Sequence, residues 1–105
     1  MNYQQVCAVA DVPEDGAIHV DVGDTPVAIV RSDGEVYAIY DVCSHEEVPL
    51  SEGDVDGTTL ECWKHGSQFD LTTGKPIQLP ATKPVPVYPV KIDGDDVFVA
   101  IDQEN

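Results

Sequence analysis

The feature that most constrains this chain is a pair of short segments that each place a cysteine beside a histidine. Cys43 and His45 are separated by one residue in "DVCSHEE", and Cys62 and His65 by two residues in "LECWKHG". Thiolate and imidazole are both strong ligands of transition metals. The chain has three cysteines and three histidines, so the two pairs use most of them. A fold that brings the two segments together would form a four-ligand metal site.

The rest of the sequence predicts a framework of short β-strands. Segments rich in β-branched and aromatic residues are separated by turn residues such as Gly23-Asp24 and Ser32-Asp33-Gly34. Gly34 is available for the left-handed position of a hairpin turn. Regular short strands of this kind are typical of an all-β sandwich or barrel. The expected strands are "QQVCAV" (4–9), 17–22, 26–31, 35–40, 86–92 and 97–101.

Residues 41–84 differ from this framework. Proline, glycine, serine and threonine are more frequent there, and the expected strands, 58–63 and 67–71, are shorter. Both Cys/His pairs lie in this segment, which we interpret as an insertion in the β framework. The proline-rich stretch 79–89 cannot be a central strand because proline has no N–H for the sheet, so we expect a covering loop there.

Charge and apolar patterning exclude several classes of partner. Twenty acidic residues face five basic ones, for a net charge of −15, which argues against binding to nucleic acid or an anionic membrane surface. The same field would attract a basic partner protein. No apolar run is long enough to span a membrane, and the first residues do not resemble a secretory signal. With an odd number of cysteines, these observations predict a cytoplasmic protein with reduced thiols.

Two kinds of metal centre suit two cysteines and two histidines. Structural zinc accepts this set, but zinc fingers usually place both cysteines on one segment and both histidines on another. Here each segment supplies one of each. A two-iron, two-sulfide cluster explains the mixed pairs better, because two facing loops can each give a Cys to one iron and a His to the other.

The pattern C-x-H, sixteen residues, C-x-x-H resembles the Rieske family. The resemblance continues through "HGSQFDLTTGKP" and "LPATKPVPVYPVKIDGDDVFVAI" and so covers most of the chain. It implies an antiparallel β-sandwich of the Rieske type with an inserted cluster-binding subdomain. Residues 1–105 would form a single Rieske domain, with the subdomain at about 41–84.

The resemblance also implies the cofactor, which is one Rieske-type [2Fe-2S] cluster per chain. Cys43 and Cys62 would bind one iron as thiolates, and His45 and His65 would bind the other. Two thiolates and two neutral imidazoles leave the oxidised cluster uncharged, which makes it easier to reduce than a cluster with four thiolates.

Departures from the family's high-potential members indicate the subtype. Those members carry an additional disulfide between the two loops, and the corresponding positions here are Val48 and Lys64. Their serine and tyrosine hydroxyls bond to cluster sulfurs, whereas this chain keeps Ser67 but has Phe69 in place of the tyrosine. The resemblance therefore points to soluble, low-potential Rieske ferredoxins.

Other residues near the expected cluster have supporting roles. Trp63, between two expected ligands, is expected to pack under the cluster loop, and the resemblance implies that Pro80 limits solvent from the covering loop. Gly53 and Gly66 are expected to permit tight loop geometry. Away from the motifs, Cys7 is expected to be a buried thiol.

The expected function is electron transfer and not catalysis. His19 is the one histidine outside the pairs, and we expect it at the surface, so the chain cannot build the mononuclear iron site of an oxygenase. The ferredoxin resemblance implies a flavin-dependent reductase as electron donor and a terminal oxygenase as acceptor. Stand-alone Rieske proteins associated with iron–sulfur cluster assembly look similar, and they give an alternative with assembly proteins as partners.

Overall fold

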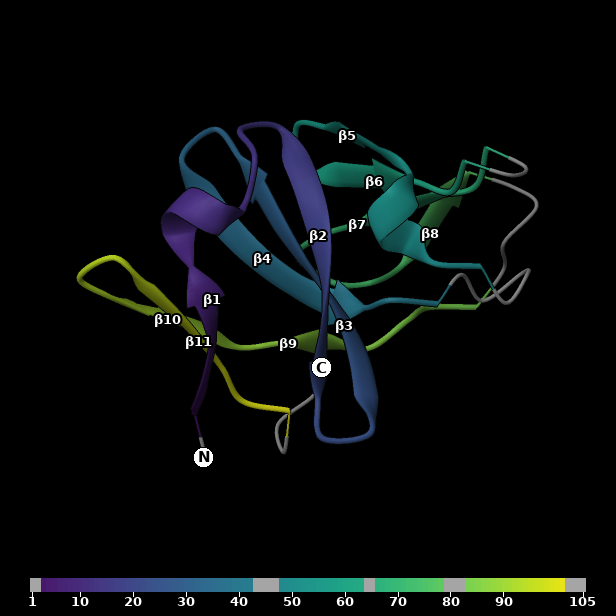
Figure 1. The fold of residues 1–105 in the computed structure, drawn as a ribbon. Coiled ribbons are helices and arrows are strands. Elements are labelled where there is room, and N and C mark those ends of the chain that lie inside the picture. Colours follow the sequence, from purple (N-terminus) through teal and green to yellow (C-terminus); the bar gives the residue numbers. More distant parts are fainter. Residues whose placement is uncertain (1–2, 43–47, 64–65, 79–82, 102–105) are drawn as a thin grey trace.

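The computed structural model describes residues 3–42, 48–63, 66–78 and 83–101 (Figure 1). Within these residues it contains antiparallel β-strands and two short 3-10 turns, η1 (Val9–Asp11) and η2 (Leu50–Glu52). The predicted all-β antiparallel architecture is confirmed. A search of the described residues finds no helix with the length and apolar character needed to cross a membrane.

The central sheet has the strand order β2-β3-β4-β9. Its strands are β2 (Gly16–Val22), β3 (Thr25–Ser32), β4 (Glu35–Tyr40) and β9 (Val87–Tyr88). The first three strands were predicted within one or two residues at each end. Their alternation with turn residues made them visible, because hairpin partners that are adjacent in sequence need only a short turn to pair.

The turn between β3 and β4 has the conformation that the sequence indicated. Asp33 and Gly34 have φ angles of 52° and 79°. Two consecutive positive φ angles are typical of the two-residue hairpin turns whose twist matches that of the flanking strands.

The middle strand, β3, is buried on both faces. Val27 and Ile29 contact one apolar core, Ala28 and Val30 contact another, and all four side chains are fully inaccessible to solvent. Because successive side chains point to opposite faces of a strand, burial of both faces requires a continuous apolar run. This explains why "PVAIV" does not alternate with polar residues.

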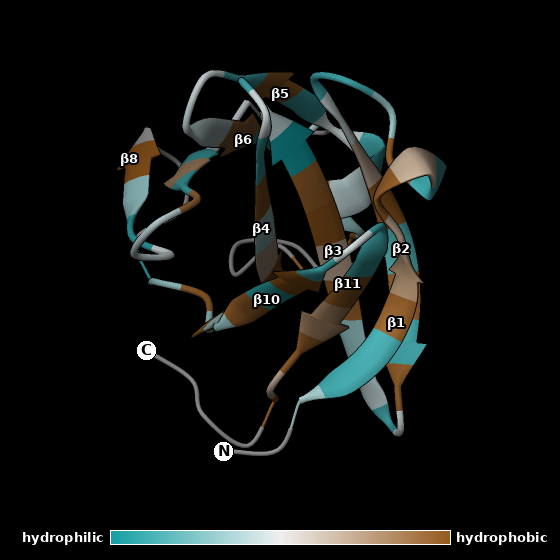
Figure 2. Ribbon diagram, turned by 90° about the vertical axis from the view of Figure 1, so that its left-hand side faces the viewer, coloured by the Kyte–Doolittle hydropathy of each residue, from teal (hydrophilic) through white to brown (hydrophobic). Residues whose placement is uncertain are grey.

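A three-stranded sheet covers the face of β3 that carries Val27 and Ile29 (Figure 2). Its order is β1-β11-β10, formed by β1 (Gln4–Ala8), β11 (Asp96–Val99) and β10 (Val90–Asp93). Val97 and Val99 of β11 are fully buried in the shared core. This sheet and the central sheet form the two layers of the sandwich.

A second four-stranded sheet covers the opposite face of β3. Its order is β5-β6-β7-β8, formed by β5 (Asp54–Asp56), β6 (Thr59–Glu61), β7 (Gln68–Asp70) and β8 (Pro76–Gln78). It lies within the segment 41–84 that the sequence marks as different. The core between this sheet and the central one contains Ala28, Val30, Ile39, Leu50, Leu60, Cys62, Phe69, Leu71, Val85 and Val87.

The structure corrects one predicted strand and adds others. Residues 86–92 form two strands, because β9 pairs with β4 and β10 pairs with β11 in a different sheet. Pro89, which separates them, has no N–H to continue one ladder. The strands β5 and β8 and both 3-10 turns were not predicted, since three residues are too few to show a period.

Gly74, in the connection between β7 and β8, lies against the chain that enters β9. Its φ is 76°, and a Cβ atom there would lie 1.9 Å from the carbonyl oxygen of Val85. The Val85 N–H donates to the Gly74 carbonyl at 2.9 Å. Two backbones in contact leave no space for a side chain, so this position requires glycine.

We therefore predict that Gly74→Ala destabilises the protein by about 2–4 kcal/mol, because both the steric overlap and the positive φ oppose alanine. Gly94→Ala is the matched control. Gly94 also has a positive φ, 64°, but nothing lies within 4 Å of its Cβ position. It should cost only about 1–2 kcal/mol for the left-handed conformation. Denaturation of the two variants in urea measures the difference, and equal losses would contradict the role of the Val85 contact.

Candidate metal centre

The structure describes one of the four expected ligands, Cys62. Cys43, His45 and His65 lie outside the described residues, as does Pro80 of the covering loop. The described part of the site therefore consists of Cys62, the two ends of the first Cys/His segment, and the residues that hold them.

Cys62 follows β6 and is fully buried in the core below the second Cys/His segment. Its N–H donates to the carbonyl of Ser67 at 2.6 Å, and its carbonyl accepts from the N–H of Gly66 at 3.0 Å. Gly66 has a φ of 76°. These bonds hold Cys62 next to Gly66 and Ser67, and the positive φ of Gly66 agrees with the tight geometry expected for that residue.

Asp41 joins the two ends of the first Cys/His segment. Its side chain is fully buried and lies two residues before Cys43 in the sequence. Its Oδ1 accepts from the N–H of Ser51 at 2.6 Å, and its Oδ2 accepts from the Ser51 hydroxyl at 2.7 Å. Because Ser51 lies in η2, the segment 42–50 starts and finishes at one pair of hydrogen bonds.

His19 completes this arrangement from strand β2. Its Nδ1 lies 2.5 Å from Oδ2 of Asp41, and its Nε2 lies 2.9 Å from Oδ1 of Asp21. An ionised carboxylate only accepts hydrogen bonds, so a ring that faces one at each nitrogen is favoured in its doubly protonated form. The hydrogen bond to Asp41 is the main cause that raises the pKa of His19, with Asp21 adding to it and desolvation opposing it.

A pocket of about 420 Å³ lies beside the side chains of His19 and Asp41. Val42 and Val48, which flank the first ligand pair in the sequence, both line it, and Val48 also packs against the core below. The complete lining is His19, Pro26, Tyr40, Asp41, Val42, Val48 and Pro49. The two ends of the first ligand segment thus border one hollow next to the network.

Gly53 links the first segment to the second. A Cβ atom at Gly53 would lie 1.8 Å from the carbonyl oxygen of Glu61, the residue that precedes Cys62. The Gly53 N–H donates to the carbonyl of the fully buried Leu50 at 2.9 Å. The tight geometry expected for Gly53 is therefore a close approach of two backbones.

The turn after β7 is held by Asp70, whose Oδ1 accepts from the N–H and the hydroxyl of Thr72 at 2.8 and 2.6 Å. These hydrogen bonds, the side-chain one first, lower the pKa of Asp70 below its usual value. The turn leads to Gly74 and so to the contact with Val85. The conformation of "DLTTGKP" is thus fixed by its own side chains.

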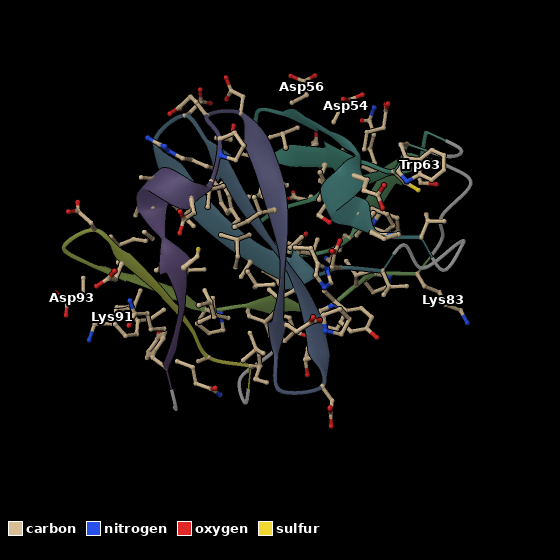
Figure 3. All side chains as sticks on the ribbon, in the orientation of Figure 1. Asp54, Asp56, Trp63, Lys83, Lys91 and Asp93 are labelled. Atoms are coloured by element: carbon tan, nitrogen blue, oxygen red, sulfur yellow. The ribbon has the colours of Figure 1, made fainter. Side chains whose placement is uncertain are left out.

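Trp63 differs from the expectation that it packs under the cluster loop. Its side chain is 53% exposed, and Figure 3 places it and Lys83 at the end of the molecule opposite Lys91 and Asp93. The indole therefore presents much of its surface to solvent immediately after Cys62. Ser67, in contrast, is fully buried.

Several residues that build this region were missed in the sequence. Asp41 and Ser51 carried no signal, because an acidic residue is unremarkable in a chain with twenty of them. His19 lies partly at the surface as expected, with 42% of its side chain exposed, yet it contacts two carboxylates. Cys7 is only partly buried, and burial followed by the charge of Asp11 raises the pKa of its thiol.

We predict that the contribution of His19 to stability depends on pH. Its pKa is raised above an unfolded-state value of about 6.5, so the stabilisation is fully present below that pH and is lost as pH rises through the folded-state pKa. The difference in unfolding temperature between wild type and His19→Asn should therefore shrink from about pH 6 upward. A difference that stays constant across this range would contradict a raised pKa.

The chain was compared with known proteins. The family description "Rieske [2Fe-2S] domain" matches residues 2–89. The 3-phenylpropionate/cinnamic acid dioxygenase ferredoxin subunit of Escherichia coli K12 is 45% identical over 100 residues, which are 94% of this chain and 93% of that protein.

Solved structures agree with the sequence comparison. The ferredoxin of carbazole 1,9a-dioxygenase from Nocardioides aromaticivorans IC177 matches with a TM-score of 0.90 and 33% identity, covering 95% of this chain and 98% of that one. A chain in the complex of reduced oxygenase and oxidised ferredoxin of carbazole 1,9a-dioxygenase matches with a TM-score of 0.86 and 37% identity, covering 93% and 92%.

The described part of the site fits what this match requires. Cys62 supplies a buried thiol whose backbone is hydrogen-bonded to Gly66 and Ser67, and the segment with the other Cys/His pair starts and finishes at hydrogen bonds of Asp41. The cofactor is a Rieske-type [2Fe-2S] cluster, as the matched domain indicates. From the extent of the family match and the identity to a ferredoxin subunit, the chain belongs to the Rieske [2Fe-2S] domain family.

Proposed function

We propose that this protein is a one-electron carrier that takes electrons from a flavin-dependent reductase and passes them to a terminal oxygenase. The observation that carries the proposal is its likeness, over nearly the full length of both chains, to proteins named as ferredoxins of dioxygenase systems. A chain from a ferredoxin–oxygenase complex also matches in fold, with a TM-score of 0.86. The cytoplasmic location expected from the sequence is part of this proposal.

We propose Cys43, His45, Cys62 and His65 as the cluster ligands. The buried thiol of Cys62 supports this set, because a buried thiolate needs a compensating cation. When bound, a cluster with this donor set supplies a one-electron redox couple at higher potential than four thiolates would give. We treat 1–105 as one domain and about 41–84 as its cluster-binding subdomain.

The residues around Cys62 support electron transfer at one edge of the proposed cluster. The core under Cys62, which includes Leu60 and Phe69, is fully buried and excludes water from below. Trp63, on the other side of Cys62, is exposed. We infer that a partner protein approaches the centre from the side of Trp63 and not through the buried core. Exposed aromatic side chains also favour protein contact.

The test of this function begins with the metal content of the protein. The protein is purified without air, its iron and sulfide are determined by chemical analysis, and its dithionite-reduced form is examined by EPR. Matched iron and sulfide with a rhombic signal of low average g is the expected result. Zinc in a folded protein, without such a signal, would refute the cluster and leave a structural zinc site. The proteins that co-purify with it then distinguish the two possible roles. Recovery of assembly proteins without an oxygenase would favour the role in cluster assembly.

We predict that Cys62→Ala loses most of its iron and sulfide, because one thiolate ligand is removed. Cys7→Ala is the matched control, since Cys7 is a partly buried thiol far from the motifs in the sequence. It should keep both elements at the wild-type level. Metal and sulfide analysis of the purified variants measures the effect. A fully loaded Cys62→Ala protein would remove Cys62 from the ligand set.

We predict that electron transfer to the partner is slowed by salt. With a net charge of −15, the chain should associate with a basic partner face through long-range attraction. The second-order rate constant should fall about ten-fold or more as ionic strength rises from about 0.01 M to about 1 M, over which the Debye length shrinks from about 30 Å to about 3 Å. Stopped-flow mixing of reduced protein with oxidised oxygenase measures it. A rate independent of salt would contradict steering by charge.

A further inference from the structure

A network of three side chains joins strand β2, the residue after β4 and turn η2 at the base of the first Cys/His segment. We propose that His19, Asp41 and Ser51 act as positioning residues that hold the segment 42–50 in the geometry that retains the cluster and sets its reduction potential. The inference rests on the proposed ligand set, because Cys43 and His45 lie in that segment.

Hydrogen bonds join the two ends of the segment 42–50. Asp41 precedes it, Ser51 follows it, and both polar groups of Ser51 donate to the one carboxylate, at 2.6 and 2.7 Å. A segment closed at its ends has far fewer conformations than an open one of the same length. Two ligands within it are therefore presented with less loss of entropy when the cluster binds.

Asp41 itself is held in place by burial and by hydrogen bonds. Its side chain is fully buried, and its N–H donates to the carbonyl of Pro26 at 3.0 Å, which continues the pairing of β3 and β4. The preceding residue, Tyr40, donates to the carbonyl of Pro86 at 2.9 Å. A carboxylate can be buried only where hydrogen bonds satisfy it. These bonds come here from Ser51 and from His19.

His19 lies outside the segment, in strand β2. It is paired with Ala28 in the ladder of β2 and β3, so its backbone is fixed by the central sheet. Its ring approaches Asp41 at Nδ1 and Asp21 at Nε2, and Tyr40 lines the pocket next to it. His19 therefore connects the buried carboxylate to the central sheet through its ring.

The network also reaches the second segment. Ser51 lies in η2, and Gly53 immediately after η2 packs its backbone on the carbonyl of Glu61. Glu61 is followed by Cys62. A shift of η2 would therefore move the chain that leads to Cys62 as well as the segment that contains Cys43. Because ligand orientation and the groups around it set the potential of an iron–sulfur centre, such a shift should change that potential.

The experiment compares three variants at His19 and Asp21. His19→Ala removes both hydrogen bonds of the ring. His19→Asn keeps the bond to Asp41, because its amide nitrogen takes the place of Nδ1. Asp21→Asn, at a side chain that is 69% exposed, removes only the outer carboxylate. For each loaded protein we measure the rate of iron loss to a chelator, the midpoint potential and the EPR g values.

The expected result separates positioning from general stability. His19→Ala should lose iron about ten-fold faster and show a shifted potential and altered g values. His19→Asn and Asp21→Asn should stay close to wild type in all three. Ser51→Ala, which removes only the hydroxyl, should shift the potential in the same direction as His19→Ala, and it carries the test if His19→Ala does not fold.

Two results would overturn the inference. One is a His19→Ala or Ser51→Ala protein that unfolds more easily but keeps the wild-type potential and g values, since the network would then be only structural. The other is an equal effect of Asp21→Asn, which would make the surface charge responsible. Absence of iron and sulfide from the wild-type protein would instead refute the proposed ligand set and function.

Discussion

Burial of the central sheet on both faces is the constraint on which the rest of the structure depends. A sheet with two apolar faces must be covered twice, and the chain supplies β1, β11 and β10 for one face and β5–β8 for the other. The segment with the Cys/His pairs is thus not an appendage to a finished sandwich. Its Leu60, Phe69 and Leu71 complete the core of the central sheet, so folding of the metal-binding region and of the framework are energetically coupled.

This coupling explains how the two Cys/His segments can present metal ligands. Each Cys/His pair directly follows a short element that is fixed in the core: Cys62 follows β6, and the first pair follows Asp41 at the end of β4. Turns alone would be too flexible to hold metal ligands in place. Placing the two cysteines three residues beyond β4 and one residue beyond β6 ties them to strands that pack in the core. The close backbone approaches at Gly53 and Gly74 then fix the surrounding loops without using side chains.

Sequence reasoning found those parts of the molecule that depend on local pattern. The hairpin from β3 to β4 and the alternation or continuity of apolar residues were visible because each depends on near neighbours. Asp41, Ser51 and His19 were not, since their meeting depends on how distant strands pack, and each residue alone looks like an ordinary surface group. Trp63 shows the opposite error, because an aromatic residue between expected ligands suggested burial while its side chain is half exposed. The division of 86–92 into two strands could have been predicted from Pro89, because proline interrupts a ladder. The sheet that each of the two strands joins could not.

The acidic surface has two consequences for the proposed carrier that act over different distances. Toward a basic partner, twenty carboxylates create an attraction in solvent that ions screen within a few ångströms to tens of ångströms. Toward the cluster, the same negative field disfavours addition of an electron and so lowers the potential, and this effect acts partly through protein of low dielectric, where ions screen it less. An excess of carboxylates therefore makes the reduced protein a stronger donor while speeding its encounter with an acceptor.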